Sequence, residues 1–354
     1  MKHFYSKIIL LLFFTFTLNS FLFGQYIQVD TSLPKEELID KFIGTNTGCI
    51  TISNINISGY NRAYDEISYG YFTKGTSSFD LSEGIILSTG KAKDAEGPNS
   101  SLQDFWGSNW GGDQDLIDIL IKSNLPHDYI LNATYLEFDF ISNLTTDQIS
   151  FEYMFLSEEY QSSNCQYSDA FAFLIKKADN SEPYQNIALI PNTTIPVTSL
   201  TINGARDCPR NISYFGGFNS ANSPTNFNGQ TKVLKANAQI EAGTKYHIKL
   251  VIADHGDSNG RYDSAVFLKA GSFVGSKSLG SDVVLCPGTS ETIDATTANA
   301  TTYKWYKDGV EISGETNATL VVDETGYYEV EITLNTGCSL KGHINISVLE
   351  KPQV

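Results

Sequence analysis

The chain has 354 residues, of which 41% are hydrophobic, 12% aromatic and 18% charged. It therefore has enough apolar mass for about two packed domains, and it is neither a disordered tail nor a collagen-like rod. Asp and Glu outnumber Lys and Arg by 40 to 24, giving a formal net charge of −16. Repulsion by the phosphate backbone excludes nucleic acid as a partner. Divalent cations and an extracellular location suit such an acidic surface better.

The N-terminus has the pattern of a secretory signal peptide over residues 1–24. Lys2 and Lys7 give a positively charged start, and an almost unbroken apolar run follows from Ile8 to Phe16. Small or polar residues come after the run, which predicts cleavage after Gly24. The alternative is a transmembrane anchor, but the apolar run is shorter than the ~20 residues that a spanning helix needs. No later segment is apolar enough to cross a membrane. We therefore expect a secreted or cell-surface protein.

Residues 25–278 are expected to form one domain made mainly of β-strands. The segment 34–43 predicts a short helix that Ser32 can cap, and residues 113–123 predict another helical turn or two. Elsewhere apolar and polar residues alternate with a period of two.

The alternating segments predict the core strands of this domain. They are residues 135–140, 149–155, 170–175, 246–252 and 264–270. Long polar loops separate them, notably at 91–112 and 203–229. The pattern favours an antiparallel β-sandwich of the jelly-roll or lectin-like type, with binding residues on the loops.

Two acidic segments flank the apolar strands and predict a calcium site. Calcium prefers six to eight oxygen ligands from carboxylates, amide carbonyls and backbone. The candidate ligands are Glu158, Glu159, Asp169, Asp254, Asp257, Asn259 and Asp263. Their spacing is not that of an EF-hand, and the alternative is that these side chains cap turns and face water.

The same carboxylates raise the alternative of glycoside hydrolysis, which uses a pair of acids. Glu158 and Glu159 are adjacent, so on a strand they face opposite sides, and Glu159 would need a second acid such as Asp254. The sequence contains neither a Gly-x-Ser-x-Gly elbow nor an HExxH motif. We therefore assign no catalytic residue and predict that the protein is not an enzyme.

Aromatic residues in the polar loops are candidate ligand-binding residues, because exposed rings stack on sugars or anchor protein interfaces. They are Phe105, Trp106, Trp110, Tyr214, Phe215 and Phe218. The alternative is that these rings cover the end of a sheet.

After a small-residue linker at 271–280, a second domain is expected over residues 281–349, followed by a linker-like tail at 350–354. Trp305 on an early strand and Tyr328 in an acidic, glycine-containing segment resemble an immunoglobulin-like sandwich, in which Tyr328 would be the corner tyrosine. Val330 occupies the place of the usual second cysteine. Such a unit is expected to act as a spacer.

The chain has five cysteines, and an exported protein favours their pairing. Proximity in the sequence predicts bonds between Cys165 and Cys208 and between Cys286 and Cys338. The odd count leaves Cys49 free or shared with another chain.

The order of several motifs resembles the choice-of-anchor L domain, over about residues 33–273. Gly84-Ile-Ile-Leu-Ser-Thr-Gly90, the segment from Phe151 to Tyr160 and Ser168-Asp-Ala-Phe-Ala-Phe173 carry the resemblance. The segment Tyr262–Phe273 matches as well. This family is similar to modular exported proteins that carry one of several surface anchors downstream. The resemblance implies location and modularity rather than an activity.

These patterns predict a non-enzymatic, exported binding or adhesion module that recognises an extracellular glycan or protein, with calcium as its candidate cofactor. The alternatives are a secreted glycoside hydrolase using Glu159 and a second acid, and a passive structural or matrix protein.

Overall fold

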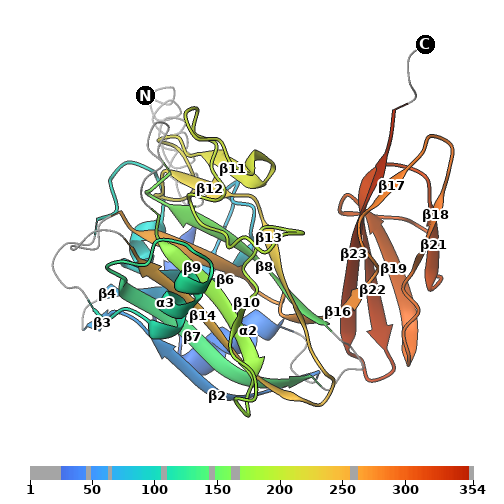
Figure 1. Cartoon of the computed structure of the whole chain (residues 1–354), viewed down its shortest axis with the longest axis horizontal. Helices are drawn as coiled ribbons and strands as arrows, with labels where there is room; N and C mark the ends of the chain where they lie inside the picture. The colour runs from blue at the N-terminus through green and yellow to red at the C-terminus, as the bar shows by residue number, and fades with distance from the viewer. Residues whose placement is uncertain are drawn as a thin grey trace, which may run out of the picture.

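The computed structural model describes residues 25–44, 49–62, 66–104, 110–142, 148–160, 168–255 and 262–350. The signal-peptide prediction and the end of the predicted tail lie outside them. The fold is mainly β, as predicted, and most strand pairs are antiparallel. Figure 1 shows two parts, which we call the N-terminal unit (described residues up to 278) and the C-terminal unit (281–350).

The first sheet of the N-terminal unit has five antiparallel strands in the order β10-β9-β14-β7-β2. Their bounds are Gln185–Asn186 for β10, Ala170–Lys177 for β9, Lys245–Asp254 for β14, Leu131–Ser142 for β7 and Ile50–Ser58 for β2. Three of the five alternating segments form β7, β9 and β14, which confirms that prediction.

The second sheet faces the first and has the strand order β1-β5-β6-β15-β8-β16 within this unit. These strands are Gln28–Asp30, Tyr69–Thr73, Glu83–Ser88, Ser264–Lys269, Gln148–Ser157 and Val274–Ser278, in the same order. Strands β12 (Gly229–Thr231) and β13 (Leu234–Gln239) also pair with β8, and β11 (Phe215–Phe218) pairs with β12. The other two alternating segments form β8 and β15, as predicted.

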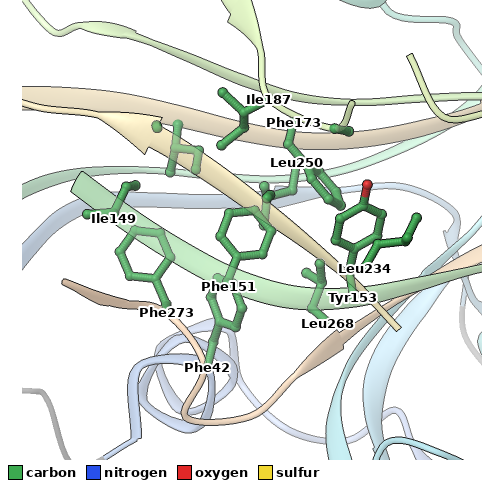
Figure 2. Packing of buried hydrophobic residues seen from close by; sticks show 14 of the residues in the cluster. Phe42, Ile149, Phe151, Tyr153, Phe173, Ile187, Leu234, Leu250, Leu268 and Phe273 are labelled. Carbon is green, nitrogen blue, oxygen red and sulfur yellow. The ribbon is translucent and has the colours of Figure 1, made fainter. Parts of the chain in front are cut away.

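The main core lies between the two sheets. Figure 2 shows Ile149, Phe151 and Tyr153 side by side along β8. The ring centroid of Phe151 lies 5.1 Å from that of Phe173 on the facing sheet and 5.5 Å from that of Phe42. On its other face β8 buries Met154 and Leu156 against a second apolar cluster, so the second half of the strand is apolar on both sides.

Two α-helices cover the sheets. Helix α2 (Lys35–Ile43) buries its apolar face on the main core, and α3 (Gln114–Lys122) covers the outer face of the first sheet. Both were predicted. Asp113 caps α3 through a 3.0 Å hydrogen bond from the Leu116 N–H, whereas the residue that precedes α2 is Pro34, so the predicted Ser32 cap is wrong. Short elements complete the unit: the 3₁₀ turns η2 (Ala92–Ala95) and η3 (Ile212–Tyr214), and the hairpin of β3 (Asn61–Arg62) and β4 (Glu66–Ile67).

The C-terminal unit is a small two-sheet sandwich. One sheet joins β17 (Val283–Leu285), β23 (Ser339–Val348), β22 (Gly326–Leu334), β19 (Ala300–Lys307) and β20 (Val310–Glu311), and the other pairs β18 (Glu291–Asp294) with β21 (Thr319–Val322). Trp305 is fully buried opposite Val330, and the Tyr328 hydroxyl donates to the Glu324 carbonyl at 3.1 Å. These are the positions expected for the core tryptophan and the corner tyrosine.

A continuous sheet joins the two units. Strand β16 pairs with β8 on one side and with β23 on the other, so the segment predicted as a linker is a strand within a 14-stranded sheet of the described residues.

A disulfide bond also joins the units, between Cys49 and Cys338, whose Cα atoms lie 5.6 Å apart. The predicted Cys286–Cys338 bond is therefore wrong, and Cys286 is exposed and unbonded. The prediction that Cys49 is free or shared with another chain is also wrong, because Cys49 is bonded within the chain. Strand pairing through β16 brings Cys49 and Cys338 together across 289 residues, which proximity in the sequence does not reveal. Cys208 is disulfide-bonded, and its predicted partner Cys165 lies outside the described residues.

Candidate functional site

The predicted acidic residues lie at the ends of four central strands. Glu158 and Glu159 follow β8, Asp169 precedes β9, Asp254 ends β14 and Asp263 precedes β15. All five side chains are buried, with exposed fractions of 7% or less, so they do not face water as ordinary turn carboxylates do. The other two candidates, Asp257 and Asn259, lie outside the described residues.

Strand register places these acids in two facing pairs. Ala170 on β9 is opposite Ala253 on β14, so Asp169 and Asp254 face each other one residue beyond. Ser157 on β8 is opposite Ser264 on β15, which puts Glu158 and Asp263 together in the same way. Like charges directly opposite across strands are destabilising, so each pair needs a proton or a cation.

Asp169 is the most deeply buried of the five acids. One carboxylate oxygen, Oδ1, accepts a 3.2 Å hydrogen bond from the His255 backbone N–H, and Oδ2 is buried with no hydrogen-bond partner among the described residues. Burial, followed by the charges of Asp254 and Glu159, raises the pKa of Asp169 well above its ordinary range. Burial and the neighbouring charges therefore favour the protonated form of Asp169, unless a cation takes the place of the proton.

Asp254 is fixed by a residue that sequence analysis missed. The Asn132 side-chain amide donates to Asp254 Oδ2 at 2.6 Å, and the Asn132 Oδ1 accepts from the Trp110 backbone N–H at 3.0 Å. Asn132 is itself fully buried and has a φ of 53°, a conformation that asparagine tolerates better than most residues. A polar asparagine at the start of this strand was the available signal.

Glu158 belongs to a second group of backbone and side-chain contacts. The Glu158 N–H donates to the Asp263 carbonyl at 3.1 Å, and the Gln103 N–H donates to Glu158 Oε1 at 3.1 Å. Glu158 Oε2 is buried and has no hydrogen-bond partner in the described part of the chain. Burial is the main cause that raises the pKa of Glu158 to about 8, and the charge of Asp263 adds to it. Gly90 packs against the Asp263 carboxylate, leaving no room for a Cβ.

The arrangement supplies oxygen ligands but does not close into a ready metal cage. Within the described part of the chain, no group of three or more His, Cys, Asp and Glu side chains is positioned to hold a metal ion. Calcium also takes backbone and amide oxygens and water, so two facing carboxylates beside Asn132 or Gln103 offer part of its coordination.

The predicted loop aromatics do not form one surface. The Trp110 indole donates to the Ala133 carbonyl at 2.8 Å and packs on Tyr60, with ring centroids 5.2 Å apart. Phe215 packs against Tyr160 at 5.3 Å and Phe218 at 4.9 Å, and Phe218 is 42% exposed.

Tyr214 lies apart from these contacts and lines a groove between the two units. Phe105 and Trp106 lie outside the described residues.

The motif resemblance is matched by a family model, which covers residues 28–274 of the 354. The chain belongs to the choice-of-anchor L domain family. Membership of the choice-of-anchor L family indicates a cell-surface or extracellular protein. No helix of the described residues is long and apolar enough to cross a membrane.

Solved structures show only remote likeness to this choice-of-anchor L protein. The two immunoglobulin domains of DIP-gamma share 7% identity over 62% of this chain and 90% of theirs, with a TM-score of 0.18. The adhesin domain of Epf from Streptococcus pyogenes shares 8% identity over 64% and 84%, with a TM-score of 0.18. A beta-1,2-glucanase from Parabacteroides distasonis shares 9% over 62% and 33%, with a TM-score of 0.16. None of these carries an argument about function, and no curated protein matches the sequence.

Proposed function

We propose that the protein is a non-enzymatic extracellular binding or adhesion module, secreted or held at the cell surface, which recognises a glycan or protein and is stabilised by calcium. The observation that carries the proposal is that two pairs of buried carboxylates, Asp169 with Asp254 and Glu158 with Asp263, face each other at the ends of the central strands. Family membership supports the extracellular location. A disulfide bond between the units supports it too, because such bonds persist in oxidising compartments.

Calcium accounts for the acidic strand ends better than a purely structural role. Among the residues that the structure describes, none is a hydrogen-bond partner of the buried Glu158 Oε2 or Asp169 Oδ2, and an unsatisfied buried polar atom costs about 1–3 kcal/mol. A divalent cation would satisfy these oxygens and cancel the repulsion within each pair. Extracellular calcium modules bind with dissociation constants of about 10⁻⁴–10⁻³ M, so a weak, partly hydrated site suits the location.

The joined units support a role in display rather than in catalysis. A continuous sheet and a disulfide bond hold the C-terminal unit on the N-terminal unit, which suits a rigid spacer. A hydrolase using Glu159 would need an open cleft, but Glu159 and Asp254 are 7% and 2% exposed. The small cavity beside this cluster, lined by Asp169 and His255, has a volume of about 10 Å³, too little for a sugar.

The test measures thermal unfolding and ligand retention with and without calcium. We expect millimolar calcium to raise the melting temperature of chelator-treated protein, and we expect this shift to be lost in Asp169→Asn and Glu158→Gln. Asp40→Asn changes an exposed helical acid and serves as the control that keeps the shift. If calcium does not change the melting temperature of the wild type, the proposed stabilisation by calcium is refuted. Turnover of a polysaccharide that Glu159→Gln abolishes would refute the non-enzymatic part.

A further inference from the structure

A groove of about 580 Å³ lies where the two units meet. We call it the junction groove. Its walls come from η3 and β13 of the N-terminal unit and from β22 and β23 of the C-terminal unit. In Figure 1, β16 lies between β13 and the strands β22 and β23. Its volume lies within the range of about 300–1,000 Å³ that small-molecule sites occupy, and such sites favour domain junctions.

An ion-pair network that crosses the junction forms one wall. The Lys235 ammonium donates to the Tyr327 hydroxyl and, at 3.1 Å, to Glu329 Oε1, and it lies 3.8 Å from Glu152 Oε1. Lys269 also pairs with Glu152. These contacts join β13 to β22 across the junction. They also pair the carboxylates of Glu152 on β8 and Glu329 on β22 with lysines.

Asp282 presents a different kind of acceptor at the groove. Its Oδ1 accepts from the Asn345 backbone N–H at 2.9 Å, and its Oδ2 accepts from the side-chain amides of Asn345 at 3.1 Å and Asn192 at 3.3 Å. The Asn192 contact crosses between the units. A carboxylate flanked by amides offers acceptors and donors a few ångströms apart, which is what neighbouring hydroxyls on a sugar ring require.

Aromatic and uncharged polar groups complete the lining. Tyr214 lines the groove and is only half-buried, so ring surface remains at the site, whereas the Lys235 ammonium lies over the Tyr327 ring, 5.0 Å from its centroid. The His343 ring lies 5.8 Å from that of Tyr327, and burial lowers the pKa of His343 to about 4, so this histidine is neutral at pH 7. The exposed amide of Asn237 lies on the same wall as Lys235.

We propose that the junction groove binds an uncharged oligosaccharide. The Tyr214 ring provides a stacking surface for the apolar face of a sugar, and the Asp282 cluster and Asn237 bind sugar hydroxyls. An acidic glycan is disfavoured because Lys235 is already engaged and the chain carries a net charge of −16. This inference rests on the proposed binding function and names its site and ligand class.

The test applies the full mature chain to an array of neutral oligosaccharides, acidic oligosaccharides and extracellular proteins, and then titrates the neutral sugar that is retained. We expect Tyr214→Ala and Asn237→Ala each to weaken binding about tenfold, with unchanged melting temperatures. Ile212→Ala, on the same 3₁₀ turn as Tyr214, and Gln239→Ala, on the same strand as Asn237, are exposed controls outside the groove and should bind as the wild type does.

The outcomes separate this inference from the proposed function. Retention of a protein or an acidic glycan alone would overturn the inference while upholding a binding module. Wild-type affinity for the neutral sugar in both groove variants would also overturn it, because the sugar would then bind elsewhere. A wild-type chain that retains no probe of any class would overturn both proposals.

Discussion

The bond between Cys49 and Cys338 is the feature of the fold whose removal has the clearest expected effect. We predict that the double variant Cys49→Ala/Cys338→Ala folds but loses about 3 kcal/mol of unfolding free energy. The cysteines are 289 residues apart, so the chain-entropy model sets an upper limit of about 5–6 kcal/mol, and measured values are commonly 2–4 kcal/mol. Both side chains are at least 94% buried, so the smaller alanines add a packing cost.

Equilibrium urea unfolding monitored by tryptophan fluorescence measures this loss. Trp305 is buried in the core of the C-terminal unit and therefore reports on its unfolding. Without the bond we expect the C-terminal unit to unfold at lower urea than the N-terminal unit, because only strand pairing and side-chain contacts then join them.

Cys286→Ala is the matched control, since Cys286 is exposed and unbonded, and its unfolding curve should overlay that of the wild type. The reasoning is refuted if Cys286→Ala is the destabilising change, or if the double variant unfolds like the wild type. Peptide mapping without reduction should recover the Cys49 and Cys338 peptides linked.

Three further predictions follow from single contacts. In chelator, the contribution of protonated Glu158 to the free energy of unfolding is fully present below pH 4.5 and is lost as the pH rises through about 8, by at most about 5 kcal/mol. Urea unfolding from pH 5 to 9 should show this loss, and a Glu158→Gln variant whose stability falls as steeply would contradict it. Tyr328→Phe should lower the free energy of unfolding in urea by about 1 kcal/mol, because it removes the hydrogen bond to the Glu324 carbonyl. The Tyr306 hydroxyl lies 3.5 Å from the Glu331 carboxylate, so Tyr306→Phe should change the stability little, and equal effects of the two variants would argue against a corner role for Tyr328. Lys249→Met should lower the free energy of unfolding by about 3 kcal/mol, because it leaves Asp113 buried without its cation. Lys122 is exposed, so Lys122→Met should leave the stability unchanged in the same assay, and an equally unchanged Lys249→Met would show that the ion pair is dispensable.

The strands were predictable because their alternation has a direct structural cause. On β7, Leu136, Phe138 and Phe140 face the main core while Glu137 and Asp139 lie on the other face, as the period of two requires. Helix α3 was equally predictable, from an apolar segment that follows the capping Asp113.

The features that the sequence did not reveal depend on which strands are neighbours. Cys49 meets Cys338 because β16 pairs with strands of both units, and no local pattern encodes that pairing. The acidic residues were found by type, but their arrangement as facing pairs follows from the register of β8 with β15 and of β9 with β14. The Tyr214 ring could be predicted as a binding candidate, whereas its place in the same groove as Tyr327 could not.

Calorimetric titration of calcium chloride into chelator-stripped protein at pH 7.5 tests the acidic strand ends most directly, when it is run in two buffers that differ in ionisation enthalpy. Because burial raises the pKa of Glu158 to about 8 and that of Asp169 well above its ordinary range, we predict saturable calcium binding that releases protons, present in Asp40→Asn and lost in Asp169→Asn. Titrations with no saturable heat at about 10 mM calcium, an order of magnitude above typical extracellular sites, or binding that Asp169→Asn leaves intact, would contradict it.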